Sequence, residues 1–519
     1  MPQQRQLSGS AGFYVVLQPS QRAAVRWALV AGPQILSLST PRIKRFFGNI
    51  SLVVLLNLLV KPGWVVLENI VQDRLGHAAF GLFTALSALT LVLATVSDLG
   101  LTHYSVKRVA SEPAFLTEYF PTILPLRGLL NVVALAGMLA VGWIIGYRGY
   151  PLLLLGAIGL SLLLAQYGQF LRGTLQAHQH FNTDAVLSVF EKFLLLGLVL
   201  GLLPLGLTLE RYVGVRVAAA IFTTALLYAL MTRFFGRVRY RWQWAQARTV
   251  LRETVPFAVI TLLYGVNERV DMVMLERLAS PTEAGYYAGA YRWVDAVMMY
   301  IWTVLPLFFA KFAGAAHNQQ EQRDLLWFGQ RVVTVPMLLV CAFVLFRGEV
   351  LFWQFKHSTP EEVARMAWCL KILFVNVLVH SFFALYASLL NSTRLVNMVS
   401  WLVGISVTLN IALNVVFLPR YGAVAAAWNT LFCAVFVSGV YVWLVQKKAG
   451  VAVPWALLTR MLAVFGALCG TWYAMQTYLQ LTWLLEAVAA GIVFLGLVPA
   501  LGIVRLAELK QLLKRKTEA

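Results

Sequence analysis

Acidic residues are scarce in this chain of 519 residues, which holds only 22 aspartates and glutamates against 42 lysines and arginines. Charged side chains make up 12% of the sequence, whereas a soluble domain averages about a quarter. With 60% of the residues hydrophobic, this composition excludes a soluble fold, because no single core could hide so much apolar surface. Carboxylates are costly in hydrocarbon, so their scarcity indicates helices that face lipid.

Cysteine and catalytic motifs are also lacking. The four cysteines are single, widely spaced and embedded in apolar runs, without a CxxC pair or a histidine at metal-ligand spacing. They are Cys341, Cys369, Cys433 and Cys469. No nucleophile with a nearby base and no phosphate-binding glycine loop occurs in the sequence. The sequence therefore predicts no catalytic residues, no metal and no cofactor, and an enzymatic function is not expected.

Long apolar runs dominate the rest of the chain. About 20 apolar residues are needed to cross roughly 30 Å of hydrocarbon, and the sequence contains fourteen such runs. They lie near residues 46–71, 79–102, 119–146, 150–172, 184–208, 212–235, 254–275, 285–312, 328–348, 365–390, 395–417, 422–446, 454–478 and 481–505. The sequence therefore predicts an all-α, polytopic membrane protein with about fourteen transmembrane helices.

Lysine and arginine are concentrated in alternate loops. The largest clusters lie before the first predicted span, in residues 233–252 and after the last span. By the positive-inside rule these segments are cytoplasmic, so both termini are predicted inside, as the even number of spans also requires. The basic residues lie between apolar segments and do not form one stripe, so the formal charge of +20 does not indicate nucleic-acid binding.

An internal repeat divides the predicted spans. LENIVQDRLG, residues 67–76, matches VDMVMLERLA, residues 270–279, at an offset of 203, and YVGVRVAAA from Tyr212 matches YGAVAAAWN from Tyr421 at an offset of 209. The nearly equal offsets predict two parallel six-helix bundles that enclose a cleft. The predicted domains are a cytoplasmic extension (1–43), an N-lobe (44–235), a basic cytoplasmic linker (236–253), a C-lobe (254–447) and two further helices with a basic tail (448–519).

Three segments carry a resemblance to a known family. The run VPFAVITLLYGVNERVDMVMLERLASPTEAGYYAGAYRWVDAV, residues 255–297, resembles the start of the second lobe in Wzx-type polysaccharide flippases of the MATE-like MOP superfamily. SDLGLTHYSVKR, residues 97–108, resembles the end of their second helix, and LNIALNVVFLPRYGAVAAAWNTL, residues 409–431, resembles their eleventh-to-twelfth helix junction. The similarity covers roughly residues 44–447.

The resemblance implies a function as well as a fold. Members of this family move undecaprenyl-diphosphate-linked oligosaccharides from the cytoplasmic to the outer leaflet, for surface polysaccharides such as the O-antigen of lipopolysaccharide. It implies a monomer in the bacterial inner membrane, with the lipid-linked oligosaccharide, membrane lipids and other polysaccharide assembly proteins as partners. Transport would proceed by alternating access, as the two lobes rock around the cleft.

Basic residues at membrane depth are the candidate ligands for the diphosphate of such a substrate. Arginine offers a planar donor fork matched to phosphate oxygens, and a water-poor cleft strengthens the attraction. The predicted cleft cations are Lys61, Arg127, Arg269 and Arg292. The alternative is that such residues form intramembrane ion pairs that only reduce the cost of burial, as Arg292 with Asp295 or Arg269 with a nearby carboxylate would do.

Carboxylates at membrane depth form a second candidate set. Glu68 and Asp271 are equivalent under the offset of 203, so they are predicted to line the cleft from both sides, and Asp295 adds a third carboxylate. These groups could accept a coupling proton or sodium ion as the lobes rock. The alternative for Glu68 and Asp271 is a position near the outer interface, where a carboxylate reaches water cheaply.

Other transport and enzyme functions remain open at this point. A lipid II flippase is hard to separate from a polysaccharide flippase by sequence. A MATE-type multidrug antiporter would need an acidic cleft to attract organic cations, whereas several basic residues lie at membrane depth here. An O-antigen polymerase or ligase would carry catalytic residues on a long outer loop, but the longest predicted outer loop, residues 349–364, is short and contains only His357.

Overall fold

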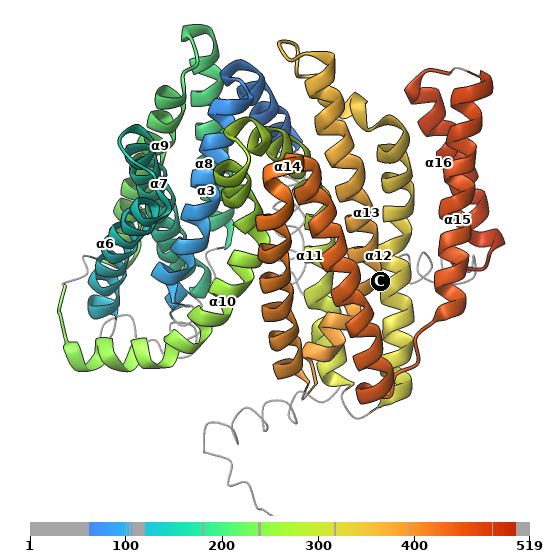
Figure 1. The fold of residues 1–519 in the computed structure, drawn as a ribbon. Helices are drawn as coiled ribbons and strands as arrows, with labels where there is room; N and C mark the ends of the chain where they lie inside the picture. Colours follow the sequence, from blue (N-terminus) through green and yellow to red (C-terminus); the bar gives the residue numbers. More distant parts are fainter. Residues whose placement is uncertain are drawn as a thin grey trace, which may run out of the picture.

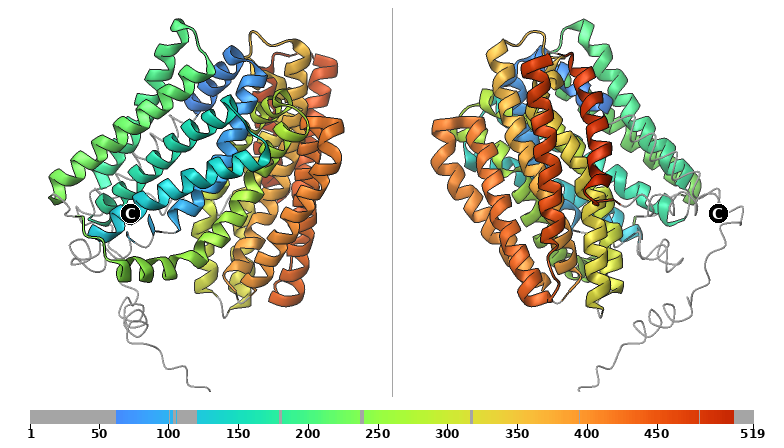
Figure 2. Two further views of the ribbon diagram at one scale, coloured as in Figure 1. Left: turned by 60° about the vertical axis from the view of Figure 1, so that its left-hand side comes forward. Right: turned by 90° about the vertical axis from the view of Figure 1, so that its right-hand side faces the viewer.

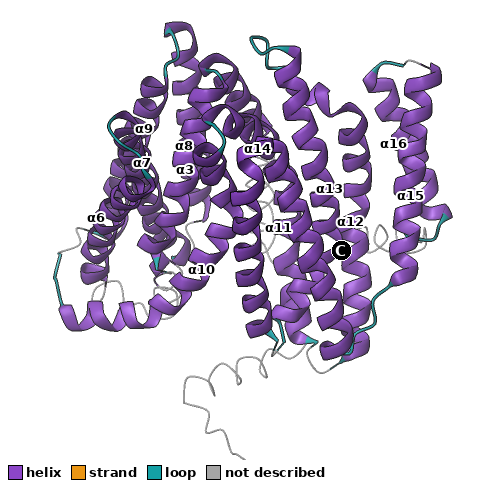
Figure 3. Cartoon of the chain, in the orientation of Figure 1, coloured by secondary structure: helices purple, strands orange, loops and turns teal. Residues whose placement is uncertain are grey.

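The structure is a computed structural model that describes residues 62–99, 101–102, 105, 120–178, 181–236, 240–315, 318–393, 395–479 and 481–504. Within these ranges every regular element is a helix, and Figure 3 shows the helices joined by short loops. This confirms the prediction of an all-α, polytopic chain. The predicted extension 1–43 and the candidate Lys61 lie outside the described residues.

The helices of the N-terminal half lie where the sequence predicts spans. Residues 62–75 are helical and include the end of the first predicted span. The helices that follow are α3 (His77–Asp98), α6 (Phe120–Ile145), α7 (Tyr150–Ala177), α8 (Phe181–Leu202) and α9 (Leu209–Phe235). Helix α9 begins after Thr208, whose hydroxyl accepts a hydrogen bond from the backbone N–H of Arg211. Thr208 is therefore the N-cap of this helix.

The C-terminal half continues with longer helices. They are α10 (Trp244–Leu278), α11 (Pro281–Gly314), α12 (Gln319–Arg347), α13 (Pro360–Asn391), α14 (Val396–Leu444), α15 (Trp455–Ala474) and α16 (Trp483–Ala500). Ser280, Asn318 and Thr359 cap α11, α12 and α13 by accepting a hydrogen bond from a backbone N–H in the first turn. These caps satisfy donors that the helix itself leaves unpaired, and therefore define where the three helices begin.

Helix α14 joins two predicted spans through a break at Gly422. The backbone there has φ 57° and ψ −135°, a conformation that favours glycine. A Cβ atom at this position would also overlap the carboxylate of Glu283, which accepts a hydrogen bond from the backbone N–H of Ala423 at 2.7 Å. The chain therefore breaks between the predicted spans 395–417 and 422–446, so that α14 consists of two helices that meet at Gly422.

Eleven helices among the described residues are long and apolar enough to cross a membrane. Helix α14 counts once in this number, although it contains both of the predicted spans that meet at Gly422. Helix α10 is not among these eleven; its longest uncharged stretch, residues 254–267, is followed directly by Glu268 and Arg269. The charges at the end of this stretch belong to the candidate site described below.

The helices form two groups that meet along α3. The N-terminal group comprises residues 62–75, α3 and α6–α9, and the C-terminal group comprises α10–α14. Figures 1 and 2 show the α6–α9 helices inclined to the α11–α14 helices, with α10 crossing from one group to the other. Helix α3 packs against α6 and α7 on one side and against α10 and α11 on the other. The predicted domain limits at residues 235 and 254 stay a prediction.

The two groups are joined at one end by polar contacts and by close backbone packing. Asp73 accepts hydrogen bonds from the His357 backbone N–H at 3.0 Å, and its other oxygen lies 2.6 Å from His357 Nδ1. His77 Nε2 lies 3.0 Å from Ser358 Oγ. A Cβ at Gly285 would overlap the carbonyl oxygen of His77, so a glycine is required where α11 passes α3. We call the Asp73–His357 pair with the His77–Ser358 contact the clasp; under the predicted topology it lies on the outer side.

Helices α15 and α16 lie beside α12, outside the two groups (Figure 1). Arg347, at the end of α12, donates two hydrogen bonds to the carboxylate of Glu486 on α16, at 2.7 and 2.6 Å. Glu486 is fully buried, so its charge depends on this paired geometry. The pair ties α16 to the C-terminal group.

Candidate substrate-binding cavity

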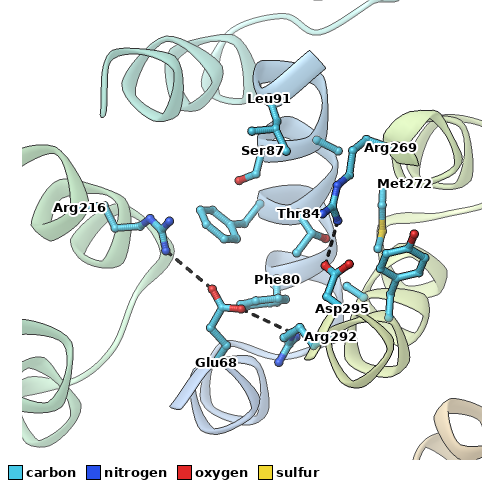
Figure 4. Close-up of a pocket in the computed structure, with 14 residues that line it drawn as sticks. Glu68, Phe80, Thr84, Ser87, Leu91, Arg216, Arg269, Met272, Arg292 and Asp295 are labelled. Carbon is cyan, nitrogen blue, oxygen red and sulfur yellow. Dashed lines mark hydrogen bonds and ion pairs between the residues drawn. The ribbon is translucent and has the colours of Figure 1, made fainter. Parts of the chain in front are cut away.

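A cavity of about 380 Å³ lies where the two groups meet. Its lining comes from residues 62–75, α3 and α9 on one side and from α10 and α11 on the other, so neither group forms it alone. Five charged side chains line it: Glu68, Arg216, Arg269, Arg292 and Asp295 (Figure 4). Aromatic and small side chains make up most of the remaining wall.

Arg292 reaches from α11 into the N-terminal group. Its guanidinium donates hydrogen bonds to the side-chain oxygens of Asn69 and Gln72, and its carbon lies 4.5 Å from the centre of the Phe80 ring. Glu68 Oε2 lies 3.8 Å from its Nε. The partners of this arginine, which is mostly buried, therefore belong to the opposite group, and its position depends on how the two groups sit together.

Arg216 approaches the cavity from α9. It donates a hydrogen bond to the hydroxyl of Tyr212, one turn earlier on the same helix, at 2.9 Å. The rings of Trp64, Phe83 and Tyr212 lie 5.4–5.8 Å from its guanidinium carbon. Rings at this distance attract a cation through their faces, so the aromatic wall holds the charge without neutralising it. Arg216 was not among the predicted ligands.

Glu68 lies between these two arginines (Figure 4). Its two oxygens are 3.8 Å from Arg216 Nη1 and 3.8 Å from Arg292 Nε. Both distances exceed those of a direct charge-assisted hydrogen bond, which are about 2.7–2.9 Å. The carboxylate therefore screens both cations without a direct hydrogen bond to either, and the hydrogen-bond partners of the two guanidinium groups are neutral side chains.

The third arginine pairs within the C-terminal group. Arg269 on α10 donates a hydrogen bond to Asp295 on α11 at 3.2 Å, and the Tyr291 ring lies 5.6 Å from its guanidinium carbon. Three guanidinium groups thus face two carboxylates among the described lining residues. The cavity has an excess of one positive charge, and its low-dielectric walls strengthen its attraction for an anion.

Four of the predicted site residues meet in this cavity: Glu68, Arg269, Arg292 and Asp295. Their roles in binding stay a prediction. The ion-pair alternative applies to Arg269, which pairs with Asp295. Asp295 pairs with Arg269 on α10 and not with Arg292, and the carboxylate within ion-pair range of Arg292 is that of Glu68. The spacing of Arg292 and Asp295 along α11 therefore predicted the wrong partner for Asp295.

Arg127 lies away from the cavity. It is buried between α6 and α3, with Nη1 2.9 Å from Asp98 Oδ1 and a further hydrogen bond to the carbonyl oxygen of Ser97. Arg127 was predicted to be a cleft cation, but it does not line this cavity. The C-terminal end of α3 supplies both a carboxylate and a carbonyl oxygen for its guanidinium. Lys61 cannot be placed, since it lies outside the described residues.

Asp271 also lies away from the cavity, inside the C-terminal group. Its carboxylate accepts hydrogen bonds from Asn414 Nδ2 at 2.7 Å and from Thr430 Oγ1 at 2.9 Å, both on α14. Asn414 also donates to Asn410 Oδ1 at 3.0 Å. The repeat predicted that Asp271 and Glu68 face each other across the cleft, but the side chains at these equivalent positions enter different surroundings. Of these two carboxylates, Glu68 lines the cavity and Asp271 does not.

A signal for Arg216 was present in the sequence. It lies in the sixth predicted apolar run, within YVGVRVAAA, and an ionisable residue at membrane depth is a candidate functional residue. The match of this segment with the one that begins at Tyr421 indicates the repeat, and the match alone does not identify its arginine as a ligand. The aromatic neighbours could not have been found this way, because Trp64 and Phe83 come from other helices.

The all-α fold resembles that of solved polytopic membrane transporters. A solved structure of the lipid II flippase MurJ in an inward closed conformation matches with a TM-score of 0.65 and 12% identity, covering 86% of this chain and 98% of that chain. An inward-facing multidrug resistance MATE family transporter of the MOP superfamily matches with a TM-score of 0.59 and 14% identity, covering 74% of this chain and 95% of that one. At these identities the likeness establishes the fold.

The family follows from the sequence comparison. A family model described as polysaccharide biosynthesis protein matches residues 46–310, and the chain belongs to this family. An uncharacterized membrane protein of Methanocaldococcus jannaschii is 24% identical over 433 residues, which cover 77% of this chain and 98% of that protein. The predicted family resemblance is thereby confirmed at the level of the polysaccharide biosynthesis family, and the fold is like that of solved MOP superfamily transporters.

Proposed function

We propose that this protein is a flippase that carries a lipid-diphosphate-linked oligosaccharide from the cytoplasmic to the outer leaflet by alternating access. The observation that supports this most directly is the convergence of Arg216, Arg269 and Arg292, from both helical groups, on one cavity. Membership of the polysaccharide biosynthesis protein family agrees with this substrate class.

The chemistry of the cavity favours a diphosphate. A guanidinium presents parallel N–H donors that match two phosphate oxygens, and Arg216 and Arg292 have only a distant carboxylate, 3.8 Å away, as a charged partner. A diphosphate that enters between them can bind more closely than Glu68 does. Because one cation comes from α9 and the other from α11, the bound substrate would draw the two groups together.

The other candidate functions fit less well. An antiporter for organic cations would need an excess of negative charge, whereas this cavity has an excess of positive charge. A lipid II flippase handles the same lipid-diphosphate chemistry, so the cavity cations do not separate it from a polysaccharide flippase. An enzyme is not expected, because the sequence carries no nucleophile with a nearby base.

Alternating access gives the clasp a place in the cycle. In the orientation proposed from the basic loops, both termini are cytoplasmic in a bacterial inner membrane and the clasp closes the outer side. Substrate would then enter from the cytoplasmic side, while its lipid tail stays in hydrocarbon. Opening of the clasp would expose the headgroup outside. Asp271, with its amide and hydroxyl neighbours, keeps its predicted role as a coupling group for a proton or sodium ion.

Substitution of the cavity arginines tests the proposal. Arg216→Gln and Arg292→Gln should each weaken binding of a polyprenyl-diphosphate-linked oligosaccharide about 10- to 100-fold, because each removes a charge-assisted hydrogen bond to phosphate. Binding is measured on the purified protein in nanodiscs, and export of surface polysaccharide is measured in cells at equal protein amounts. The matched control is Arg148→Gln, since Arg148 is an exposed arginine on the α6–α7 loop. Normal binding and export by both cavity variants would contradict the proposal.

A further inference from the structure

A second cavity, of about 250 Å³, lies inside the N-terminal group, between α3, α7, α8 and α9. It shares Ser87, Leu91 and Arg216 with the first cavity, so the two cavities are adjacent and Arg216 lies at their boundary. Its volume is below the roughly 300–1,000 Å³ of pockets for drug-sized ligands and suits a single sugar ring. None of the site residues predicted from the sequence lines it.

Away from Arg216, three polar side chains of this second cavity present hydrogen-bond acceptors. Ser161 and Thr223 donate their hydroxyl protons to carbonyls of their own helices, at 2.9 Å to Ile158 and at 2.9 Å to Ala219, so their oxygens face a ligand as acceptors. Glu191 adds a carboxylate, which lies 3.8 Å from Arg172. A ligand that satisfies these oxygens must carry several donors, as the hydroxyl groups of a sugar do.

The rest of the lining is apolar and close to the polar groups. Leucine, isoleucine and alanine side chains from all four helices provide it, among them Leu91, Ile158 and Leu195. A pyranose ring has an apolar C–H face and a rim of hydroxyl groups, which matches a wall of this mixed kind. Arg172 pairs with Asp184 at 2.5 Å and lies 3.8 Å from Glu191, so its charge only partly compensates Glu191. An acidic sugar would place a second carboxylate near Glu191, which like-charge repulsion in a low dielectric disfavours.

We propose that this second cavity is the subsite for the sugar nearest the diphosphate, and that it selects a neutral sugar over a uronic acid. The inference rests on the proposed function and deepens it. Arg216 stands where the two cavities join, which is where the bond between phosphate and sugar would lie. The first cavity therefore recognises the lipid diphosphate, and the second recognises the hydroxyl pattern of the attached sugar.

Three lipids separate this inference from the proposed function. The full-length protein in nanodiscs is titrated with a polyprenyl diphosphate, with a polyprenyl-diphosphate-linked neutral hexose and with the corresponding hexuronic acid. The wild-type protein should bind the neutral hexose form about tenfold more tightly than either of the others. Failure to bind any of the three lipids overturns the proposed function itself. Equal binding of all three overturns only the subsite.

A larger side chain that fills the second cavity tests the subsite directly. Ala220 is buried, lies on α9 and lines the second cavity, so Ala220→Leu should reduce binding of the neutral hexose form to that of the bare diphosphate lipid, which should itself bind as before. Ala218→Leu is the matched control, because Ala218 is exposed on the same helix and does not line the cavity. Equal weakening of both lipids by Ala220→Leu would overturn the subsite.

Glu191 tests the selectivity by charge. Glu191→Gln keeps an acceptor oxygen but removes the negative charge, so it should reduce the preference for the neutral hexose over the hexuronic acid about tenfold. Glu210→Gln, which changes a carboxylate in the first turn of α9 outside both cavities, should leave the preference unchanged. A preference that survives Glu191→Gln would overturn the assigned role of Glu191 and with it the selection against uronic acids.

Discussion

Arg127 and Arg292 illustrate how two buried arginines can serve different ends. Arg127 meets Asp98 at 2.9 Å and the Ser97 carbonyl, all within the N-terminal group. Arg292 meets neutral side-chain oxygens of the opposite group and a carboxylate at 3.8 Å. A guanidinium with a close counter-ion stabilises the fold, whereas one with neutral partners and a distant counter-ion keeps its charge available to a ligand.

We therefore expect Arg127→Ala to act on stability. Breaking a buried ion pair costs about 3–5 kcal/mol, and the cost here should lie at the low end because the surviving Asp98 is 27% exposed. The melting temperature of the solubilised protein should fall, while the folded fraction should bind a lipid-diphosphate-linked oligosaccharide as before. An unchanged melting temperature with lost binding would return Arg127 to the ligand role that the sequence predicted.

The charged lining of the candidate cavity was predictable from the sequence in part. Charge at membrane depth was sufficient to select Glu68, Arg269, Arg292 and Asp295, because an ionisable side chain in hydrocarbon requires a partner or a cavity. The sequence does not indicate whether a given charged residue has an ion-pair partner or lines a cavity. Arg127 finds Asp98 only because α6 packs on the end of α3, and such a contact depends on helix packing.

At the scale of elements, the clasp depends on one carboxylate that lies beyond the predicted end of the first span. Burial alone would raise the pKa of Asp73, but hydrogen bonds from the side chain and backbone of His357 outweigh it and lower the pKa below the usual 3.8. A depressed carboxylate pKa means that the contact contributes stability above pH 3.8 and loses it as the pH falls through the lowered value. The carboxylate of Asp73 therefore stays charged throughout the range from pH 5 to 8.

Asp73→Asn should loosen the clasp without changing the cavity. The amide removes the charge and one acceptor oxygen that face His357, so the end closed by the clasp should open more often. Accessibility of a cysteine introduced at Ser358 to a membrane-impermeant thiol reagent measures this opening, and we expect labelling about tenfold faster than in the Asp73 parent. Equal labelling rates in the two proteins would show that close packing at Gly285 alone holds this end closed.

Helix positions followed from the sequence more closely than helix connections did. Apolar runs of sufficient length located the described helices, since hydrocarbon thickness fixes their minimum length. The predicted runs 395–417 and 422–446 correspond to two helices that meet at a break confined to Gly422. The contact of Gly422 with Glu283 on α11 is not indicated by any pattern within 395–446.

At the scale of the whole molecule, the composition and the repeat predicted the architecture. The repeat also predicted that Glu68 and Asp271 line the cleft together. In the structure Glu68 lines the cavity, whereas Asp271 lies in a polar cluster with Asn414 and Thr430. Two related halves can preserve helix order while their side chains diverge, because packing constrains the backbone more than it constrains each polar position. A repeat therefore indicates the fold better than it indicates equivalent ligands.

The counter-charges that line the cavity have a consequence for energetics. With three arginines and two carboxylates, the empty site carries one net positive charge, and a bound diphosphodiester with two negative charges reverses its sign. An inside-negative potential would then favour outward movement of the loaded site and inward return of the empty one, by up to about 2.3 kcal/mol per charge per 100 mV. Proteoliposomes with a potassium diffusion potential should flip the lipid faster when the substrate side is negative, and the membrane voltage would then help to drive both halves of the cycle.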